Sequence, residues 1–253
     1  MSRKFVNSLL FLWASLVSAM TSLVAFYLIL EKEMNQGGTR LRGRARIFLA
    51  VKERVLTFYD ILSPLYYSVN PYFYTRSMRN EILHLMDGDR CIIVLDAGCG
   101  TGYTTEGILN RSNIKKVIGV DINGKQLERA RKRFEKAGRR FSYSMCDVEN
   151  LSFKDEVFDA VVSVGVVEYF SDPGKAVQEM SRVSKFGGKI IVGGPVLDWF
   201  HRIFLNRIFY TPSTDELKRL FNQAGLKHVE AMLTGVETYL RTEEYVVVVA
   251  GTK

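Results

Sequence analysis

The pattern of hydrophobic and polar positions divides the chain into two parts. Residues 5–30 form 26 consecutive positions without a charged side chain, whereas from residue 91 onward short apolar runs alternate with charged, amphipathic segments. An apolar helix of about 20 residues spans the hydrocarbon of a bilayer, while buried strands are much shorter. The pattern therefore predicts a transmembrane helix followed by an α/β domain.

The alternation in the second part predicts a doubly wound sheet. Apolar strands that alternate with amphipathic helices are typical of a mainly parallel sheet covered on both faces. The last two strands should form a hairpin, with the last strand antiparallel, which makes seven strands in all. We expect these strands within 91–102 and at 115–121, 141–147, 157–165, 189–195, 228–235 and 243–253, and helices at 103–111, 124–138, 172–188 and 211–227.

The N-terminal apolar segment has two alternative interpretations, a cleaved signal peptide and a helix buried in a large core. Arg3 and Lys4 suit a signal peptide, but its apolar stretch has only about 7–15 residues and ends at a small-residue cleavage site. Two Lys or Arg residues precede the segment and five come after it by residue 46, which favours a cytoplasmic location for the C-terminal side of the segment. We therefore expect residues 1–30 to be an uncleaved, single-pass anchor with the rest in the cytoplasm.

Two further segments separate this anchor from the α/β domain. Residues 31–46 form a basic linker, which either attracts anionic lipid at the membrane surface or is simply solvated. Nucleic acid is not an expected partner, because no aromatic residues are interleaved with these charges. Residues 47–86 contain apolar positions at helical spacing and an aromatic tract at 66–74. We expect them to form an amphipathic, aromatic helical segment that caps the substrate site.

Composition excludes several kinds of site. The net charge of the 253 residues is +8, and the three cysteines share no C-x-x-C spacing, which argues against a disulfide framework or a zinc site. The three histidines, His84, His201 and His228, lie in unrelated segments, so no metal site is expected.

The chemistry lies in the turn after the first strand. Gly98, Gly100 and Gly102 form a G-x-G-x-G pattern, whereas dinucleotide-binding turns usually have G-x-G-x-x-G. Asp96 stands two residues before the first glycine, where a carboxylate repels a pyrophosphate and attracts an ammonium group. Asp121, at the end of the second strand, is placed to accept hydrogen bonds from both hydroxyls of a ribose. S-adenosylmethionine has an amino group and a ribose but no phosphate, so it matches these two carboxylates. A dinucleotide carries a pyrophosphate, which Asp96 would repel, so a dinucleotide-dependent oxidoreductase is disfavoured.

The segments VLDAGCGTG, GVD, CDVENLSF and FDAVV resemble, in order and spacing, the motif series of class I S-adenosylmethionine-dependent methyltransferases. The resemblance covers about residues 91–195 and implies a Rossmann-like, seven-stranded domain over 87–253. It implies that Asp96 and the backbone of 97–102 hold the methionine moiety, that Asp121 binds the ribose and that Ile122 packs on the adenine. Asp147 and the Val148 amide would contact the adenine edge. The complete set is Asp96, Ala97, Gly98, Cys99, Gly100, Thr101, Gly102, Asp121, Ile122, Asp147, Val148 and Val164.

A narrower resemblance concerns the acceptor. SVNPYFYTRSMRNEIL, GTGYTTEGI and the segment that begins SVGVVEYFSDP are most similar to the ring C-methyltransferases of prenylated quinones, including the methyl-phytyl-benzoquinone, ubiquinone and menaquinone enzymes. This implies methylation of a ring carbon of a prenylated benzo- or naphthoquinol. The alternatives are another membrane lipid (a phospholipid headgroup amine, a sterol or an isoprenoid) and a non-catalytic, cofactor-binding membrane module.

Candidate groups for the acceptor side come after the fourth and fifth strands. Glu168 and Tyr169 are candidate catalytic or orienting residues, although a carboxylate there also suits the start of a helix. Asp198 and His201 lie in an aromatic, amphipathic stretch at 196–210, where a histidine can equally have a structural role. The catalytic candidates are therefore Glu168, Tyr169 and His201, with Asp198 beside them.

Overall fold

A computed structural model describes residues 76–86, 92–196, 212–235 and 245–253, which all belong to one compact unit within Ile47–Lys253. The predicted anchor (1–30), the basic linker (31–46) and most of the segment 47–86 lie outside the described residues, as do Asp198 and His201. Among the residues that are described, no helix is long and apolar enough to cross a membrane. The anchor and the boundaries of these segments therefore remain predictions.

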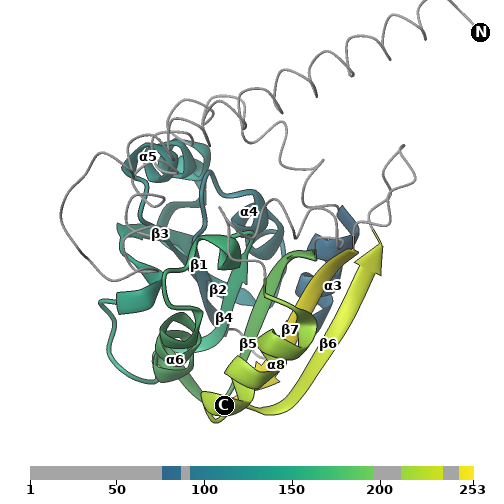
Figure 1. Cartoon of the computed structure of the whole chain (residues 1–253). Helices are drawn as coiled ribbons and strands as arrows, with labels where there is room; N and C mark the ends of the chain where they lie inside the picture. The colour runs from purple at the N-terminus through teal and green to yellow at the C-terminus, as the bar shows by residue number, and fades with distance from the viewer. Residues whose placement is uncertain (1–75, 87–91, 197–211, 236–244) are drawn as a thin grey trace, which may run out of the picture. The chain divides into compact units, whose positions relative to one another are not determined.

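The described residues form a seven-stranded sheet in the order β3-β2-β1-β4-β5-β7-β6 (Figure 1). Strands β1 to β5 pair in parallel, and β7 is antiparallel to both of its neighbours, β5 and β6. This confirms the predicted seven strands, the hairpin and the antiparallel last strand. The strands are β1 (Ile92–Ala97), β2 (Ile114–Asp121), β3 (Phe141–Met145), β4 (Phe158–Val164), β5 (Ser184–Val196), β6 (Lys227–Gly235) and β7 (Tyr245–Thr252).

Helices cover both faces of the sheet. On one face, Leu95 packs in a buried cluster with Met180 of α6 and Phe221 of α8, and both helices lie on the same side of the sheet in Figure 1. On the other face, Val94 packs in a second cluster with Ile82 of α3. The helices are α3 (Arg76–Leu85), α4 (Tyr103–Leu109), α5 (Gly124–Arg133), α6 (Pro173–Val183) and α8 (Thr214–Gln223), with short 3-10 helices η1 (Glu135–Arg140), η2 (Val148–Asn150) and η3 (Val167–Tyr169).

Three helices begin at residues whose side chains cap the helix N-terminus. The carboxylate or hydroxyl oxygens of Asp172 and Ser213 accept hydrogen bonds from N–H groups in the first turns of α6 and α8, and the Asn123 amide oxygen does the same for α5. Such caps satisfy N–H groups that have no partner within the helix. The cap of α5 lies two residues after Asp121, so the helix start is fixed beside a predicted cofactor residue.

Two predicted helices end earlier in the structure. The helix predicted over 124–138 is α5, which ends at Arg133 and is followed by the 3-10 helix η1. The sequence pattern predicts a helix over the whole of 172–188, but α6 ends at Val183 and residues from Ser184 belong to β5. Gly187 has a positive φ of 75°, its N–H donates to the Lys253 carbonyl at 3.0 Å, and the Lys253 N–H donates to the Gly188 carbonyl at 3.1 Å. The end of the chain, more than sixty residues away in sequence, therefore draws this stretch into the sheet.

Helix α3 is the only described part of the predicted capping segment. Its Ile82 is fully buried in the cluster on the sheet, and the Lys189 ammonium of β5 donates to the Leu85 carbonyl at its C-terminus at 2.6 Å. The Arg79 guanidinium lies 4.7 Å from the centre of the Tyr103 ring at the start of α4. Helix α3 is thereby attached to the element that comes directly after the glycine turn.

Candidate cofactor and active site

The site lies where the carboxyl ends of the parallel strands meet. In open α/β sheets, ligands bind outside these ends, at the point where the strand order reverses. Here the order reverses between β1 and β4, and the predicted cofactor residues lie at the ends of β1, β2 and β4 and in the turns after β1, β2 and β3. The sheet therefore brings Asp96, the glycine turn, Asp121 and Asp147 to one edge from positions up to 51 residues apart (147 − 96).

The glycine turn is fastened to the end of β2. The N–H groups of Gly98 and Cys99 both donate to the Val120 carbonyl, at 2.7 and 2.9 Å. The Gly100 N–H donates to Oδ2 of Asp121 at 2.8 Å, and Oδ1 of the same carboxylate accepts from the Asn123 N–H at 2.8 Å. Asp121 thus orders two turns at once, a role that the sequence did not reveal.

The backbone of the turn requires glycine at two positions. Gly98 has φ of 82°, and a Cβ there would lie 2.4 Å from Cγ2 of Val166, in the turn after β4. Gly102 has φ of 92°, and a Cβ there would lie 2.3 Å from a ring carbon of Phe134. Only glycine adopts such conformations without strain and also leaves this space. Val166 and Phe134 therefore shape the turn, although neither was among the predicted site residues.

Asp96 is a buried carboxyl group at the base of the turn. Its side chain is 1% exposed, and Oδ2 accepts a hydrogen bond from the Thr105 hydroxyl in the first turn of α4. Burial raises the pKa of Asp96 from its ordinary value of 3.8 to about 7, and the charge of Asp121 adds to this shift, while the Thr105 hydrogen bond opposes it. A positively charged ligand group nearby would favour the ionised carboxylate.

Burial also changes the pKa values of Asp121, at the end of β2, and Cys99, in the glycine turn. Burial raises the pKa of Asp121, an effect opposed by hydrogen bonds from the backbone of Asn123, Gly100 and Ile122. Burial also raises the pKa of the Cys99 thiol, so this thiol is neutral at physiological pH. Its Sγ packs over Gly119, where a Cβ would approach it to 2.8 Å. Cys99 therefore fills space between the turn and β2.

The predicted adenine side contains both apolar and polar groups. Ile122 comes directly after Asp121 and is 39% exposed, unusual for a large aliphatic side chain in this domain, and thus available to a flat ring. Asp147 caps η2 with Oδ1, which accepts from the Glu149 N–H at 3.1 Å. The Val148 side chain is buried in the core, whereas Val164 is half-buried at the end of β4.

Two buried polar atoms near these turns have no hydrogen-bond partner among the described residues. They are Oγ1 of Thr101, in the glycine turn, and Oε1 of Gln126, in the first turn of α5. Nearly all buried polar atoms in proteins are hydrogen-bonded, so unpaired ones call for a partner. Both atoms lie in segments that come directly after strands of the predicted cofactor site, β1 and β2.

The acceptor side is described only in part. Glu168 and Tyr169 lie in η3, shortly after β4, so the backbone brings them to the same edge as the glycine turn. The Tyr169 side chain is half-buried, and its N–H donates to the Val166 carbonyl at 2.9 Å. The Glu168 side chain is outside the part of the chain that the structure describes, and so are Asp198 and His201. Their catalytic roles remain predictions.

Comparisons with known proteins identify the domain. Residues 95–192 match the family model described as a methyltransferase domain. The chain is 34% identical over 196 residues to 2-methyl-6-phytyl-1,4-hydroquinone methyltransferase 2, chloroplastic, of Oryza sativa subsp. japonica, a match that covers 76% of this chain and 56% of the relative. This chain contains a class I S-adenosylmethionine-dependent methyltransferase domain.

Further relatives agree with this identification. The chloroplastic 2-methyl-6-phytyl-1,4-hydroquinone methyltransferase of Spinacia oleracea is also 34% identical, with 76% of this chain and 56% of the relative covered. The chain thus spans little more than half the length of these curated relatives. Among solved structures, an S-adenosylmethionine-dependent methyltransferase from Thermotoga maritima has a TM-score of 0.61 and 25% identity, covering 81% of this chain and 99% of that one.

The residues of the methyltransferase domain fit S-adenosylmethionine. Burial disfavours the charge of Asp96, and the ammonium group of S-adenosylmethionine, if placed beside it, would favour that charge. Gly98 packs so closely on Val166 that no Cβ fits between them, and, among the described residues, Oγ1 of Thr101 and Oε1 of Gln126 are buried without a hydrogen-bond partner. Among the residues that the structure describes, no group of three or more His, Cys, Asp or Glu side chains could hold a metal ion.

Proposed function

We propose that the chain is a membrane-anchored methyltransferase that transfers a methyl group from S-adenosylmethionine to a ring carbon of a prenylated benzo- or naphthoquinol. The main support for this proposal is the length of the match to the plant hydroquinone methyltransferases, which extends over 196 residues. The match to the general methyltransferase domain covers only the 98 positions from 95 to 192. About half of the aligned residues therefore lie outside the general domain, where acceptor specificity is expected to be encoded.

The residues on the cofactor side have complementary roles in this proposal. Asp96 and the backbone of 97–102 hold the methionine moiety, Asp121 binds the ribose, and Ile122 packs on the adenine. Asp147 and the Val148 amide contact the adenine edge, and Val164 borders it. When bound, S-adenosylmethionine supplies an electrophilic methyl group, so the protein needs no nucleophile of its own.

The requirements on the acceptor side are positioning and a modest base. A hydroquinone ring becomes electron-rich once a hydroxyl group is deprotonated, and precise orientation of reactants contributes strongly to the rate of transfer. Glu168, Tyr169 and His201 are the candidates for orienting the acceptor or accepting its proton. Glu168 and Tyr169 are supported by the position of η3 shortly after β4, next to Val166, which packs on the glycine turn.

Membrane attachment suits an acceptor with a prenyl tail, which resides in the bilayer. Residues 1–30 are proposed as the single-pass anchor, with the methyltransferase domain on the cytoplasmic side. The basic linker 31–46 would then face anionic lipid headgroups, where each positive charge contributes about 1 kcal/mol. An enzyme held at the surface in this way meets its acceptor without extracting it into water.

The test uses the full chain with membranes and methyl-labelled S-adenosylmethionine, followed by lipid extraction and separation by class. The proposal expects label in the prenylquinone fraction. Label confined to phospholipid headgroups, sterols or other isoprenoids would contradict the quinone assignment and leave a lipid methyltransferase. Binding of S-adenosylhomocysteine without label in any lipid fraction would instead indicate a non-catalytic, cofactor-binding module.

A further inference from the structure

Two Arg–Glu pairs with the same spacing and geometry occur on α5 and α6. On α5, Arg131 donates to Glu128 through Nε at 2.8 Å and Nη2 at 2.7 Å. On α6, Arg182 donates to Glu179 through Nε at 2.7 Å and Nη2 at 2.8 Å. The pair on α6 differs from the pair on α5 because it also binds a loop.

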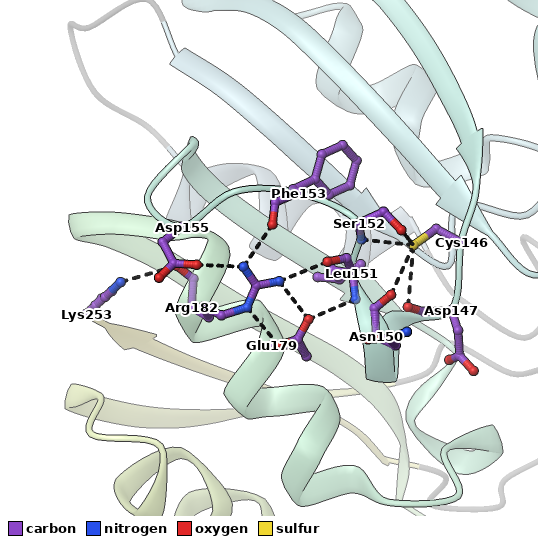
Figure 2. A network of polar contacts seen from close by, with 10 residues as sticks. All are labelled: Cys146, Asp147, Asn150, Leu151, Ser152, Phe153, Asp155, Glu179, Arg182 and Lys253. Atoms are coloured by element: carbon purple, nitrogen blue, oxygen red, sulfur yellow. Dashed lines mark hydrogen bonds and ion pairs between the residues drawn. The ribbon is translucent and has the colours of Figure 1, made fainter.

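Arg182 binds the loop 147–155, which connects β3 and β4, at three points (Figure 2). Its Nη2 donates to the Leu151 carbonyl at 2.9 Å, and its Nη1 donates to the Phe153 carbonyl at 2.8 Å and to Oδ1 of Asp155 at 2.7 Å. Two of these acceptors are main-chain carbonyls, so the guanidinium holds the course of the backbone itself. A planar guanidinium presents its donors in the fixed directions that such contacts require.

Glu179 binds the same loop as a hydrogen-bond acceptor, whereas Arg182 binds it as a donor. Its Oε2 accepts a hydrogen bond from the Leu151 N–H at 2.8 Å, so the N–H and the carbonyl of Leu151 are both bound by the pair (Figure 2). Hydrogen bonding to Arg182 lowers the pKa of Glu179, which keeps the carboxylate ionised at neutral pH. Leu151 itself is 4% exposed. The loop is therefore held at Leu151 by two side chains of opposite charge.

The turn between these contacts and β3 is closed by its own hydrogen bonds. The Cys146 Sγ accepts from the Ser152 N–H and donates to the Asn150 carbonyl, both at 3.4 Å. Oδ1 of Asp147 accepts from the Glu149 N–H. Residues 146–152 are bound to one another in this way. The contacts that hold Leu151 against α6 therefore also hold Asp147 and Val148 in place.

We propose that Glu179 and Arg182 are positioning residues for the adenine end of the cofactor. They do not contact the cofactor; they hold the loop on α6 so that Asp147 and the Val148 amide meet the adenine edge. This inference rests on the proposed function, in which those two groups contact the adenine. Recognition of a base edge by hydrogen bonds depends strongly on position, so a loosened loop discriminates less well between bases.

The test is the preference for adenine over hypoxanthine, measured by binding rather than turnover. Calorimetry on the full chain gives the Kd of S-adenosylhomocysteine and of S-inosylhomocysteine, in which an oxygen replaces the 6-amino group of the base. We expect the natural chain to prefer the adenine compound. Arg182→Met and Glu179→Gln should reduce this preference by about 3- to 10-fold, roughly the value of one hydrogen bond. Arg182→Lys should restore part of it.

The control is Glu128→Gln, which breaks the matching pair on α5 and should leave the preference unchanged. If the α6 variants bind both compounds more weakly by the same factor, or only lower the melting temperature, the pair has a merely structural role and the inference is wrong. The Glu179→Gln and Arg182→Lys variants decide the matter if Arg182→Met does not fold. A natural chain that binds S-adenosylhomocysteine without any preference also overturns the inference, whereas one that does not bind it contradicts the proposed function.

Discussion

At the scale of single residues, Asp96 is a buried carboxyl group whose charged form is disfavoured in the unliganded protein. A carboxyl group that is 1% exposed and has a pKa of about 7 retains its proton in the folded protein over a range where the unfolded chain has lost it. The folded state then binds more protons than the unfolded state between about pH 4 and 7, so stability falls as pH rises through this range. In the proposed function, the ammonium group of the cofactor offsets this cost when it binds beside ionised Asp96.

Asp96→Asn tests this interpretation, because the amide keeps an oxygen for the Thr105 hydroxyl but carries no charge. The unliganded variant should melt at a higher temperature than the natural chain at pH 8, and the difference should disappear near pH 4. Its affinity for S-adenosylhomocysteine should be about 10- to 100-fold weaker at pH 8, since a charge-assisted hydrogen bond is lost.

The pH dependence of binding provides the matching observation. An ammonium group favours ionised Asp96, so the natural chain should bind S-adenosylhomocysteine more weakly as pH falls below about 7, where the carboxyl becomes protonated. Asp96→Asn should lose this dependence. Calorimetry between pH 6 and 8 measures both proteins, and equal affinity of the variant and the natural chain would show that Asp96 does not bind the ammonium group.

At the scale of elements, the loop after β3 is joined to the segment after β4. Oε1 of Glu149, in η2, accepts hydrogen bonds from the N–H groups of Ser171 and Asp172, the latter at 3.2 Å. Asp172 is the N-cap of α6, and Tyr169 of η3 lies two residues before Ser171. One carboxylate therefore connects the predicted adenine-contacting loop to the predicted acceptor segment.

Glu149→Gln should loosen this connection on both sides. The amide retains one acceptor oxygen without the charge, so we expect a loss of about 1–2 kcal/mol in unfolding free energy and a rise in KM for both S-adenosylmethionine and the acceptor. Thermal or urea unfolding and steady-state kinetics measure these effects, with exposed Glu128→Gln as the control. A variant that is destabilised but has both KM values unchanged would show that the connection is structural only.

The parts of the fold that depend on local sequence could be predicted, and the parts that depend on distant partners could not. Buried apolar runs locate all seven strands, and the glycine turn with Asp96 and Asp121 is a local motif. The predicted end of α6 is wrong because the carbonyls of Arg182 and Val183 accept hydrogen bonds from residues 156 and 157, and residues 187–188 pair with Lys253. The roles of Val166 and Arg182 were likewise missed, since each contacts a turn that is brought near only by the sheet.

At the scale of the whole molecule, the methyltransferase domain has to reach the lipid acceptor that we propose for it. The described residues form the complete seven-stranded sheet and the cofactor edge, while the predicted anchor precedes them in the chain. The predicted cofactor residues lie at the ends of strands and in the turns after them, so cofactor binding should not need residues 1–30. Access to an acceptor in the bilayer should need them.

Deletion of residues 1–30 separates these two requirements. The truncated protein should bind S-adenosylhomocysteine with unchanged affinity, because none of the described cofactor residues lies in that segment. Its turnover on a prenylquinol embedded in vesicles should fall, whereas turnover on a short-tailed, water-soluble quinol should be retained. Equal rates of the two proteins on the embedded acceptor would contradict the proposed role of the anchor.

The most direct measurement uses the full chain, vesicles that contain reduced 2-methyl-6-phytyl-1,4-hydroquinone, and S-adenosylmethionine with a trideuterated methyl group. Tandem mass spectrometry of the extracted product locates the label. We predict a product heavier by one trideuterated methyl group in place of a ring hydrogen, with both hydroxyl groups still free. A label on a hydroxyl oxygen, or no labelled quinol from a protein that binds S-adenosylhomocysteine, would contradict ring-carbon methylation of this prenylated benzoquinol.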